Sequence, residues 1–146
     1  MKKLFLNKKL EFLVEHLESL QAFKDTNLLE LKSNPRDLKY VEKLMQELVD
    51  CAVDINQFIA EENTQTRAWS AKQSFRDLKE HKLILDDALI KKLVETVSFR
   101  NEIIHSYDVG VYLLWSKRRI KEIIELYKQY AKKVETYSKK RSSKAS

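Results

Sequence analysis

The sequence predicts an all-α, up-and-down bundle of about five helices, and three observations support this fold class. The 146 residues include one glycine and one proline, so residues that end helices are scarce. Charged residues make up 34% of the chain and hydrophobic residues 43%. Apolar residues recur at spacings of three and four, which is typical of amphipathic helices and not of a sheet. The length suits one domain with its own core, which we place at residues 1–138.

The first predicted helix covers about residues 4–24. His16 lies off its apolar stripe, so we expect this side chain at the surface. A connection with a short apolar patch follows at residues 25–34. The stripe itself consists of Leu6, Leu10, Leu13, Leu17, Leu20 and Phe23.

The second predicted helix is long and apolar over a wide arc. Asn34 or Ser33 can cap its start, and Pro35 suits the first turn, where its missing N–H does no harm. The apolar pattern continues to about Glu62. Its apolar positions are Leu38, Val41, Leu44, Met45, Leu48, Cys51, Ala52, Ile55, Phe58 and Ile59.

A polar loop at residues 63–70 follows the second helix. A tryptophan in a loop is more often a packing anchor than a stacking platform for a base, so we expect Trp69 to pack against the protein. Apolar residues between positions 75 and 84 then predict a short third helix and a turn.

Two further long helices complete the predicted bundle. The fourth starts at Asp86-Asp87, and Gly110 is expected to break it, which makes a tight antiparallel corner. The fifth covers about residues 112–137. The basic segment 139–146 resembles a disordered, solvated tail.

Net charge and cysteine content restrict the class of protein. A net charge of +6 and a pI near 9.3 favour an anionic partner such as RNA or an acidic protein. No apolar run is long enough to span a membrane.

Cys51 is expected to be a buried thiol in a reducing cytoplasm. Histidines and cysteines are too few and scattered for a zinc site, and no glycine-rich phosphate loop occurs, so we predict no metal and no cofactor.

One stretch, residues 99–108, does not resemble scaffold. It contains Arg100, Asn101, His105 and Tyr107 near the end of the fourth helix. Asn101 and His105 are four apart, so the amide can orient the imidazole. Arg100 and Tyr107 are seven apart and fall on nearly one face. Residue types alone favour a surface pair and a helix cap over catalysis.

Two carboxylates on the second helix are candidates for holding the arginine. Asp50 and Asp54 are four apart and lie close to the apolar arc. The simpler interpretation is a solvated edge. The alternative hypothesis is that one of them reaches Arg100 and fixes the guanidinium by a bidentate pair.

The pattern Arg100-x4-His105-x-Tyr107, late in a small helical bundle, resembles the signature of the HEPN superfamily. Asn101 fits the polar residue that often follows the arginine in that superfamily, and Tyr107 makes the pattern similar to the HepT toxin branch, whose partner is the MntA nucleotidyltransferase antitoxin. The resemblance extends over roughly residues 36–130. Further similar positions are Tyr40, Gln46, Asp54-Ile55 and Phe75-Arg76-Asp77-Leu78, whereas Lys43, Asp50 and Gly110-Val111 depart from the pattern of the branch.

The resemblance implies a metal-independent endoribonuclease toxin that works as a homodimer. In that interpretation His105 transfers the proton, Arg100 holds the scissile phosphate and Asn101 orients the pair. Transfer of AMP to Tyr107 by the antitoxin would block the RNA phosphate by size and charge.

Two other functions remain open at this point. The chain could be the non-catalytic, nucleotide- or substrate-binding subunit of a minimal nucleotidyltransferase, which shares this bundle and a similar motif. It could also be a helical adaptor.

Overall fold

The computed structural model describes residues 2–26, 28–81, 83, 86–105 and 119–145, and within these ranges it is helical and contains no strand. This confirms the predicted all-α class. The elements, in chain order, are α1 (Lys2–Gln21), α2 (Leu28–Lys32), α3 (Pro35–Thr64), α4 (Ala71–Arg76), the 3₁₀ turn η1 (Asp77–Lys79), α5 (Asp87–His105) and α7 (Arg119–Ala145).

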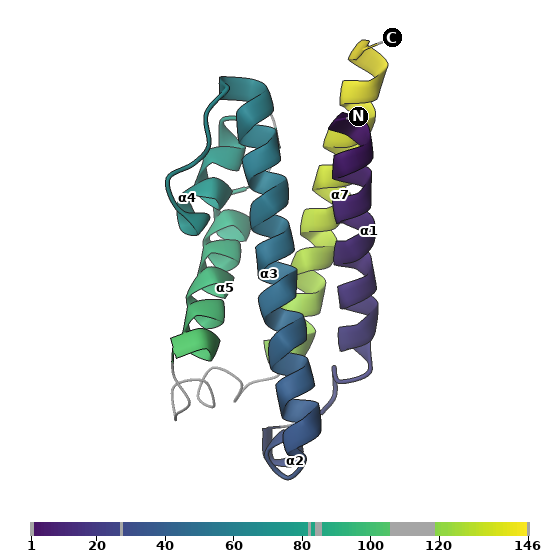
Figure 1. Cartoon of the computed structure of the whole chain (residues 1–146), viewed down its shortest axis with the longest axis vertical. Coiled ribbons are helices and arrows are strands. Elements are labelled where there is room, and N and C mark those ends of the chain that lie inside the picture. Colours follow the sequence, from purple (N-terminus) through teal and green to yellow (C-terminus); the bar gives the residue numbers. More distant parts are fainter. Residues whose placement is uncertain (1, 27, 82, 84–85, 106–118, 146) are drawn as a thin grey trace.

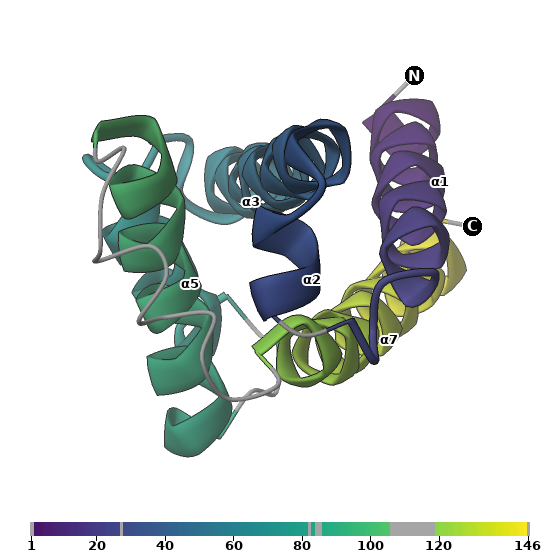
Figure 2. The ribbon, with the colours of Figure 1, turned by 90° about the horizontal axis from the view of Figure 1, so that it is seen from below.

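Four long helices form the bundle, and successive ones run in opposite directions along its long axis (Figure 1). α3 packs between α1 and α5, and α7 contacts both of these outer helices (Figure 2). The short α4 packs on α3 and α5, at the end of the bundle where α3 finishes. Because α3 is central, its side chains can reach α1 on one side and α5 and α4 on the other.

The ends of α3 follow from local chemistry. Asn34 caps its start, because the Asn34 Oδ1 accepts a hydrogen bond of 3.2 Å from the backbone N–H of Asp37, and Pro35 occupies the first turn. At the other end Gln65 takes a left-handed conformation with φ of 62°. Its N–H donates to the Glu61 carbonyl at 2.9 Å, which satisfies a carbonyl of the last turn.

The core consists of the apolar faces that the spacing predicts. Three of its largest members come from the second half of the chain: Tyr127, Tyr130 and Phe75 are fully buried. Phe75 and Tyr127 each meet Tyr130 edge to face, with ring centroids 5.9 and 5.8 Å apart. Such contacts add to the stability that burial of the rings provides.

Three predictions about individual segments were wrong. His16 is buried, not at the surface, because its Nδ1 contacts the Phe12 carbonyl at 2.9 Å and its Nε2 contacts the Glu47 carboxylate at 2.6 Å. Trp69 does not pack: 84% of it is exposed. The connection after α1 contains the short helix α2, which buries Leu31.

The C-terminal boundary also differs from the expectation. α7 continues as a helix to Ala145, through most of the segment expected to be a disordered tail. No glycine or proline interrupts this segment, and Lys139 pairs with Glu135 one turn earlier at 3.0 Å. The predicted break at Gly110 lies outside the described residues.

None of the helices in the described part of the chain combines the length and apolar character needed to cross a bilayer.

Candidate active site around Arg100

Arg100 lies on α5 and points to the facing helix α3, where it forms an ion pair with Asp50. Its Nη1 donates to Asp50 Oδ1. The arginine side chain is only 18% exposed, whereas that of Asp50 is 55% exposed. The guanidinium is therefore largely covered by the bundle and is held by a carboxylate that faces solvent. An arginine keeps its charge in such a place, so the pair provides a fixed cation at the seam between α3 and α5.

The neighbouring residue Asn101 contacts the same guanidinium. Arg100 Nε donates to Asn101 Oδ1 at 3.2 Å. Two edges of the guanidinium are thus used by protein acceptors. Among the described residues, no acceptor meets Nη2.

The second candidate carboxylate, Asp54, is directed elsewhere. It pairs with Lys9 of α1 at 2.8 Å. Of the two acids on α3, Asp50 is the one that contacts Arg100, as the alternative hypothesis had it, and the contact seen among the described residues joins Nη1 to one carboxylate oxygen. Asp54 therefore links α3 to α1, and its predicted supporting role at the Arg100 site stays a prediction.

The other two motif residues are less fully described. His105 is the last residue of α5, one turn after Asn101. Its side chain, and all of Tyr107, lie outside the described residues. Their predicted roles in catalysis and modification stay predictions.

A buried hydroxyl pair supports the helix that carries Arg100. Thr96 lies one turn before Arg100 and donates to the Leu93 carbonyl at 2.6 Å, so Tyr127 of α7 donates to the Thr96 oxygen at 2.7 Å. Burial raises the pKa of Tyr127, while the Thr96 hydrogen bond and the charge of Arg100 act in the opposite direction. The phenol therefore stays protonated and remains a hydrogen-bond donor that ties α7 to α5.

A second buried pair ties α7 to α3. Tyr130 donates to Asn56 Oδ1 at 2.5 Å, and Asn56 Nδ2 donates to the Ser74 hydroxyl of α4 at 3.2 Å. The pKa of Tyr130 is raised, chiefly by burial. The spacing of apolar residues places the two tyrosines in a helix but does not reveal their hydroxyl partners, Thr96 and Asn56. Polar residues at core-facing helix positions were the signal that could have found them.

Cys51 follows Asp50 directly, yet it is not a nucleophile. It is buried, as predicted, and its Sγ contacts the Lys9 carbonyl at 3.2 Å. Burial raises the pKa of the thiol to about 11, which outweighs the lowering effect of Lys9. The thiol is therefore neutral near physiological pH and serves packing.

A groove of about 820 Å³ lies beside the site, between α5 and α7. Thr96 and Phe99 of α5 and Leu126 of α7 line it, together with charged residues such as Lys92 and Glu122. Arg100 and Asp50 are not among its lining residues. In the described part of the chain, no three histidine, cysteine, aspartate or glutamate side chains gather as a metal site would require.

The fold and the arginine site together describe a small all-α bundle with a partly covered cation, Arg100, near the end of α5. The chain belongs to the HepT-like ribonuclease family, because the family model "Ribonuclease HepT-like" matches residues 13–134.

Two individual proteins are similar to this chain. The "tRNA nuclease HepT" of Aphanizomenon flos-aquae (strain 2012/KM1/D3) is 26% identical over 100 residues, which are 68% of this chain and 67% of the relative. A solved structure of the tri-AMPylated Shewanella oneidensis HEPN toxin in complex with MNT antitoxin superposes with a TM-score of 0.75. That match covers 90% of this chain and 97% of the other at 18% identity, so it shows a shared fold.

Proposed function

We propose that the chain is a toxin ribonuclease that cleaves RNA without a metal ion, through Arg100 and His105 and with Asn101 as the orienting residue. The observation that carries the proposal is the Asp50–Arg100 pair, which fixes a guanidinium on the last turns of α5, the helix that ends at His105. Family membership and the similar tRNA nuclease support the reaction class. We take tRNA as the first substrate to test.

The chemistry uses groups that RNA itself supplies. The 2′-oxygen attacks the neighbouring phosphorus while His105 accepts the 2′-hydroxyl proton, and the bond from phosphorus to the 5′-oxygen breaks as that oxygen takes a proton from water. The products are a cyclic phosphate end and a 5′-hydroxyl. Arg100 binds the phosphate through Nη2 and stabilises the charge that develops on it. The motif faces of two copies of the chain line one cleft that binds the RNA, so the active form is a homodimer.

Cleavage assays with purified protein test this proposal. We expect Arg100→Ala to lower the rate of tRNA cleavage in chelator by about 100- to 1000-fold, the usual cost of removing a group that stabilises transition-state charge. His105→Ala should lower it by about 100- to 10,000-fold, the contribution of a positioned proton acceptor. Arg36→Ala is the matched control, because Arg36 is exposed at the start of α3. This variant should cleave tRNA at the wild-type rate.

Two outcomes would contradict the proposal. Unchanged cleavage in both motif variants would exclude a role for the motif. Nucleotide binding without any cleavage by the wild type would instead support the non-catalytic subunit of a nucleotidyltransferase.

The same proposal includes control by a nucleotidyltransferase antitoxin that modifies Tyr107. The phenol oxygen attacks the α-phosphorus of ATP, a new oxygen–phosphorus bond forms, and pyrophosphate leaves. The solved HEPN toxin of similar fold is described as AMPylated and bound to an MNT antitoxin, which supports this step. Tyr127 and Tyr130 are poor competitors, because they are fully buried and their pKa values are raised.

Mass spectrometry of peptides tests the modification. After incubation with the partner enzyme and ATP, we expect AMP on Tyr107 and none on Tyr107→Phe. Tyr40 provides an internal control, because it is 45% exposed and carries the same phenol group as Tyr107. An adduct on Tyr40, or the absence of any adduct, would remove Tyr107 from the proposal.

A further inference from the structure

Trp69, in the loop between α3 and α4, is 84% exposed, the largest exposed fraction among the large hydrophobic side chains of the described residues. Its indole makes no ring contact within this part of the chain. Burying a tryptophan contributes strongly to stability, so a fully displayed one contributes little to the fold. Tryptophan is enriched among the few interface residues that carry most of the binding energy.

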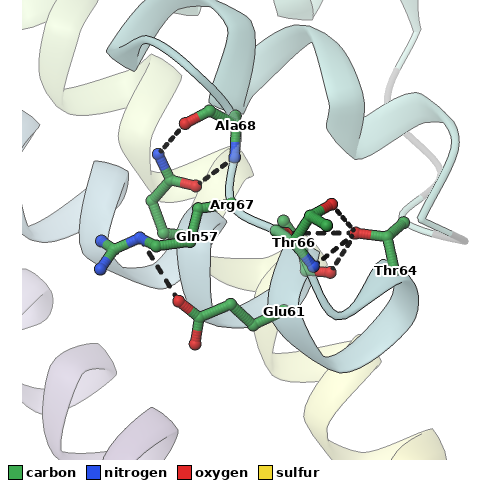
Figure 3. Close-up of polar contacts among 7 residues, drawn as sticks. Gln57, Glu61, Thr64, Thr66, Arg67 and Ala68 are labelled. Carbon is green, nitrogen blue, oxygen red and sulfur yellow. Dashed lines mark hydrogen bonds and ion pairs between the residues drawn. The ribbon is translucent and has the colours of Figure 1, made fainter.

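The backbone on the N-terminal side of Trp69 is held firmly by a buried side chain of α3. Gln57 is only 8% exposed, and its amide bonds both polar groups of Ala68. Gln57 Nε2 donates to the Ala68 carbonyl at 3.0 Å, and the Ala68 N–H donates to Gln57 Oε1 at 2.7 Å (Figure 3).

The backbone on the other side of Trp69 is held as well. Ser70 caps α4, because its hydroxyl accepts a hydrogen bond of 3.0 Å from the N–H of Gln73. Trp69 therefore lies between two tethered residues. A ring displayed on such a fixed loop loses little conformational freedom when it binds, which favours affinity.

The charge around Trp69 indicates an anionic partner. Residues 65–79 contain Arg67, Lys72, Arg76 and Lys79 against the single acid Asp77, although Lys79 also pairs with Asp87 of α5 at 2.9 Å. Arg67 is 63% exposed, and Figure 3 shows its pairing with Glu61 at 3.3 Å.

The sequence neighbours of the indole are polar, small or basic: Arg67, Ala68, Ser70 and Lys72. An aromatic anchor for a protein partner is usually surrounded by further apolar contacts. A single ring among cations instead matches the way proteins hold unpaired bases, by stacking beside contacts to phosphates.

We propose that Trp69 is a stacking platform for an unpaired base of the RNA substrate. This inference rests on the proposed ribonuclease function and specifies its substrate as RNA with a single-stranded segment. Gln57, which holds the loop, lies seven residues after Asp50 on α3, or about 10 Å along the helix axis. α4, which starts just after Trp69, packs on both α3 and α5, the helices that carry Asp50 and Arg100. We therefore expect the base that stacks on Trp69 to belong to the RNA strand that is cleaved, a few nucleotides from the cleaved bond.

Binding measurements test the platform separately from cleavage. All variants are made in the full chain with Arg100→Ala, so that RNA stays intact, and the probe is a short fluorescein-labelled single-stranded RNA. We expect Trp69→Ala to weaken binding by about tenfold, the effect of losing one base–aromatic stack. Trp69→Phe keeps an aromatic face and should stay within about threefold of the parent. Trp69→Leu keeps an apolar side chain without that face and should resemble Trp69→Ala.

The same strand annealed to its complement is the control, because paired bases cannot leave the stack to meet the indole. Its binding should change little in any variant. Equal binding of single-stranded RNA by Trp69→Ala and its parent would overturn the inference, as would a similar loss for duplex. Unchanged RNA binding together with weaker binding of the nucleotidyltransferase partner would replace it with a protein contact. If the wild type binds the single strand through Trp69 but does not cleave it, the platform stands and the ribonuclease proposal fails.

Discussion

The two seams on either side of α3 use the same chemistry for different ends. On the α1 side, Asp54 pairs with Lys9, and 31% of the lysine side chain and 48% of the aspartate side chain are exposed. On the α5 side, Asp50 pairs with Arg100, which is 18% exposed. In the first seam the cation is the ammonium group of a partly exposed lysine. The second places a planar, permanently charged group under partial cover.

The difference arises from a small step along one helix. Asp50 and Asp54 are four residues apart, so they differ by about 40° around the axis of α3 and about 6 Å along it. That step is enough to direct one carboxylate to α5 and the other to α1. Proximity in sequence and identical side chains therefore say little about function, and the partner decides whether a carboxylate belongs to the site or to the scaffold.

The sharpest test of this comparison is to remove each carboxylate charge in turn. We expect Asp50→Asn to lower tRNA cleavage by about tenfold or more, because a guanidinium that loses its partner no longer has one fixed position. Asp54→Asn should cleave at the wild-type rate, since its partner Lys9 lies on the opposite seam. Rates at saturating tRNA and at low tRNA separate lost catalysis from lost binding. Equal losses in the two variants would show that the seams are not functionally distinct.

The arrangement of the long helices could be read from the sequence because it depends on local rules. Apolar residues at spacings of three and four defined the buried faces, and Asn34-Pro35 marked the start of α3. α2 escaped detection because five residues are too few to show a helical period. His16 was misplaced because its burial depends on Glu47, which is 31 positions away in the chain.

Only some residues of the candidate site could be predicted from the sequence. Arg100 and Asn101 were found through their motif, and Asp50 was one of two candidates for the arginine's partner. Which acid faces α5 depends on how the helices pack, and no local pattern encodes that choice. The exposure of Trp69 was missed for a related reason: Gln57 controls the loop from eleven positions before Ala68, and a glutamine in a helix has no such role on average.

A smaller effect separates the seams by stability. Double-mutant cycles for Lys9→Met with Asp54→Asn should give a coupling in the free energy of unfolding of about 0.2–1 kcal/mol, because both side chains are partly exposed and the pair is screened by water. The coupling should fall further at high salt, since exposed charges are screened within about 10 Å or less. The corresponding cycle for Arg100→Met with Asp50→Asn should give a larger coupling that salt affects less, because the arginine is largely covered. Urea denaturation followed by circular dichroism measures both cycles. A Lys9–Asp54 coupling that equals or exceeds the Arg100–Asp50 coupling would mean that burial of the cation does not distinguish the two seams.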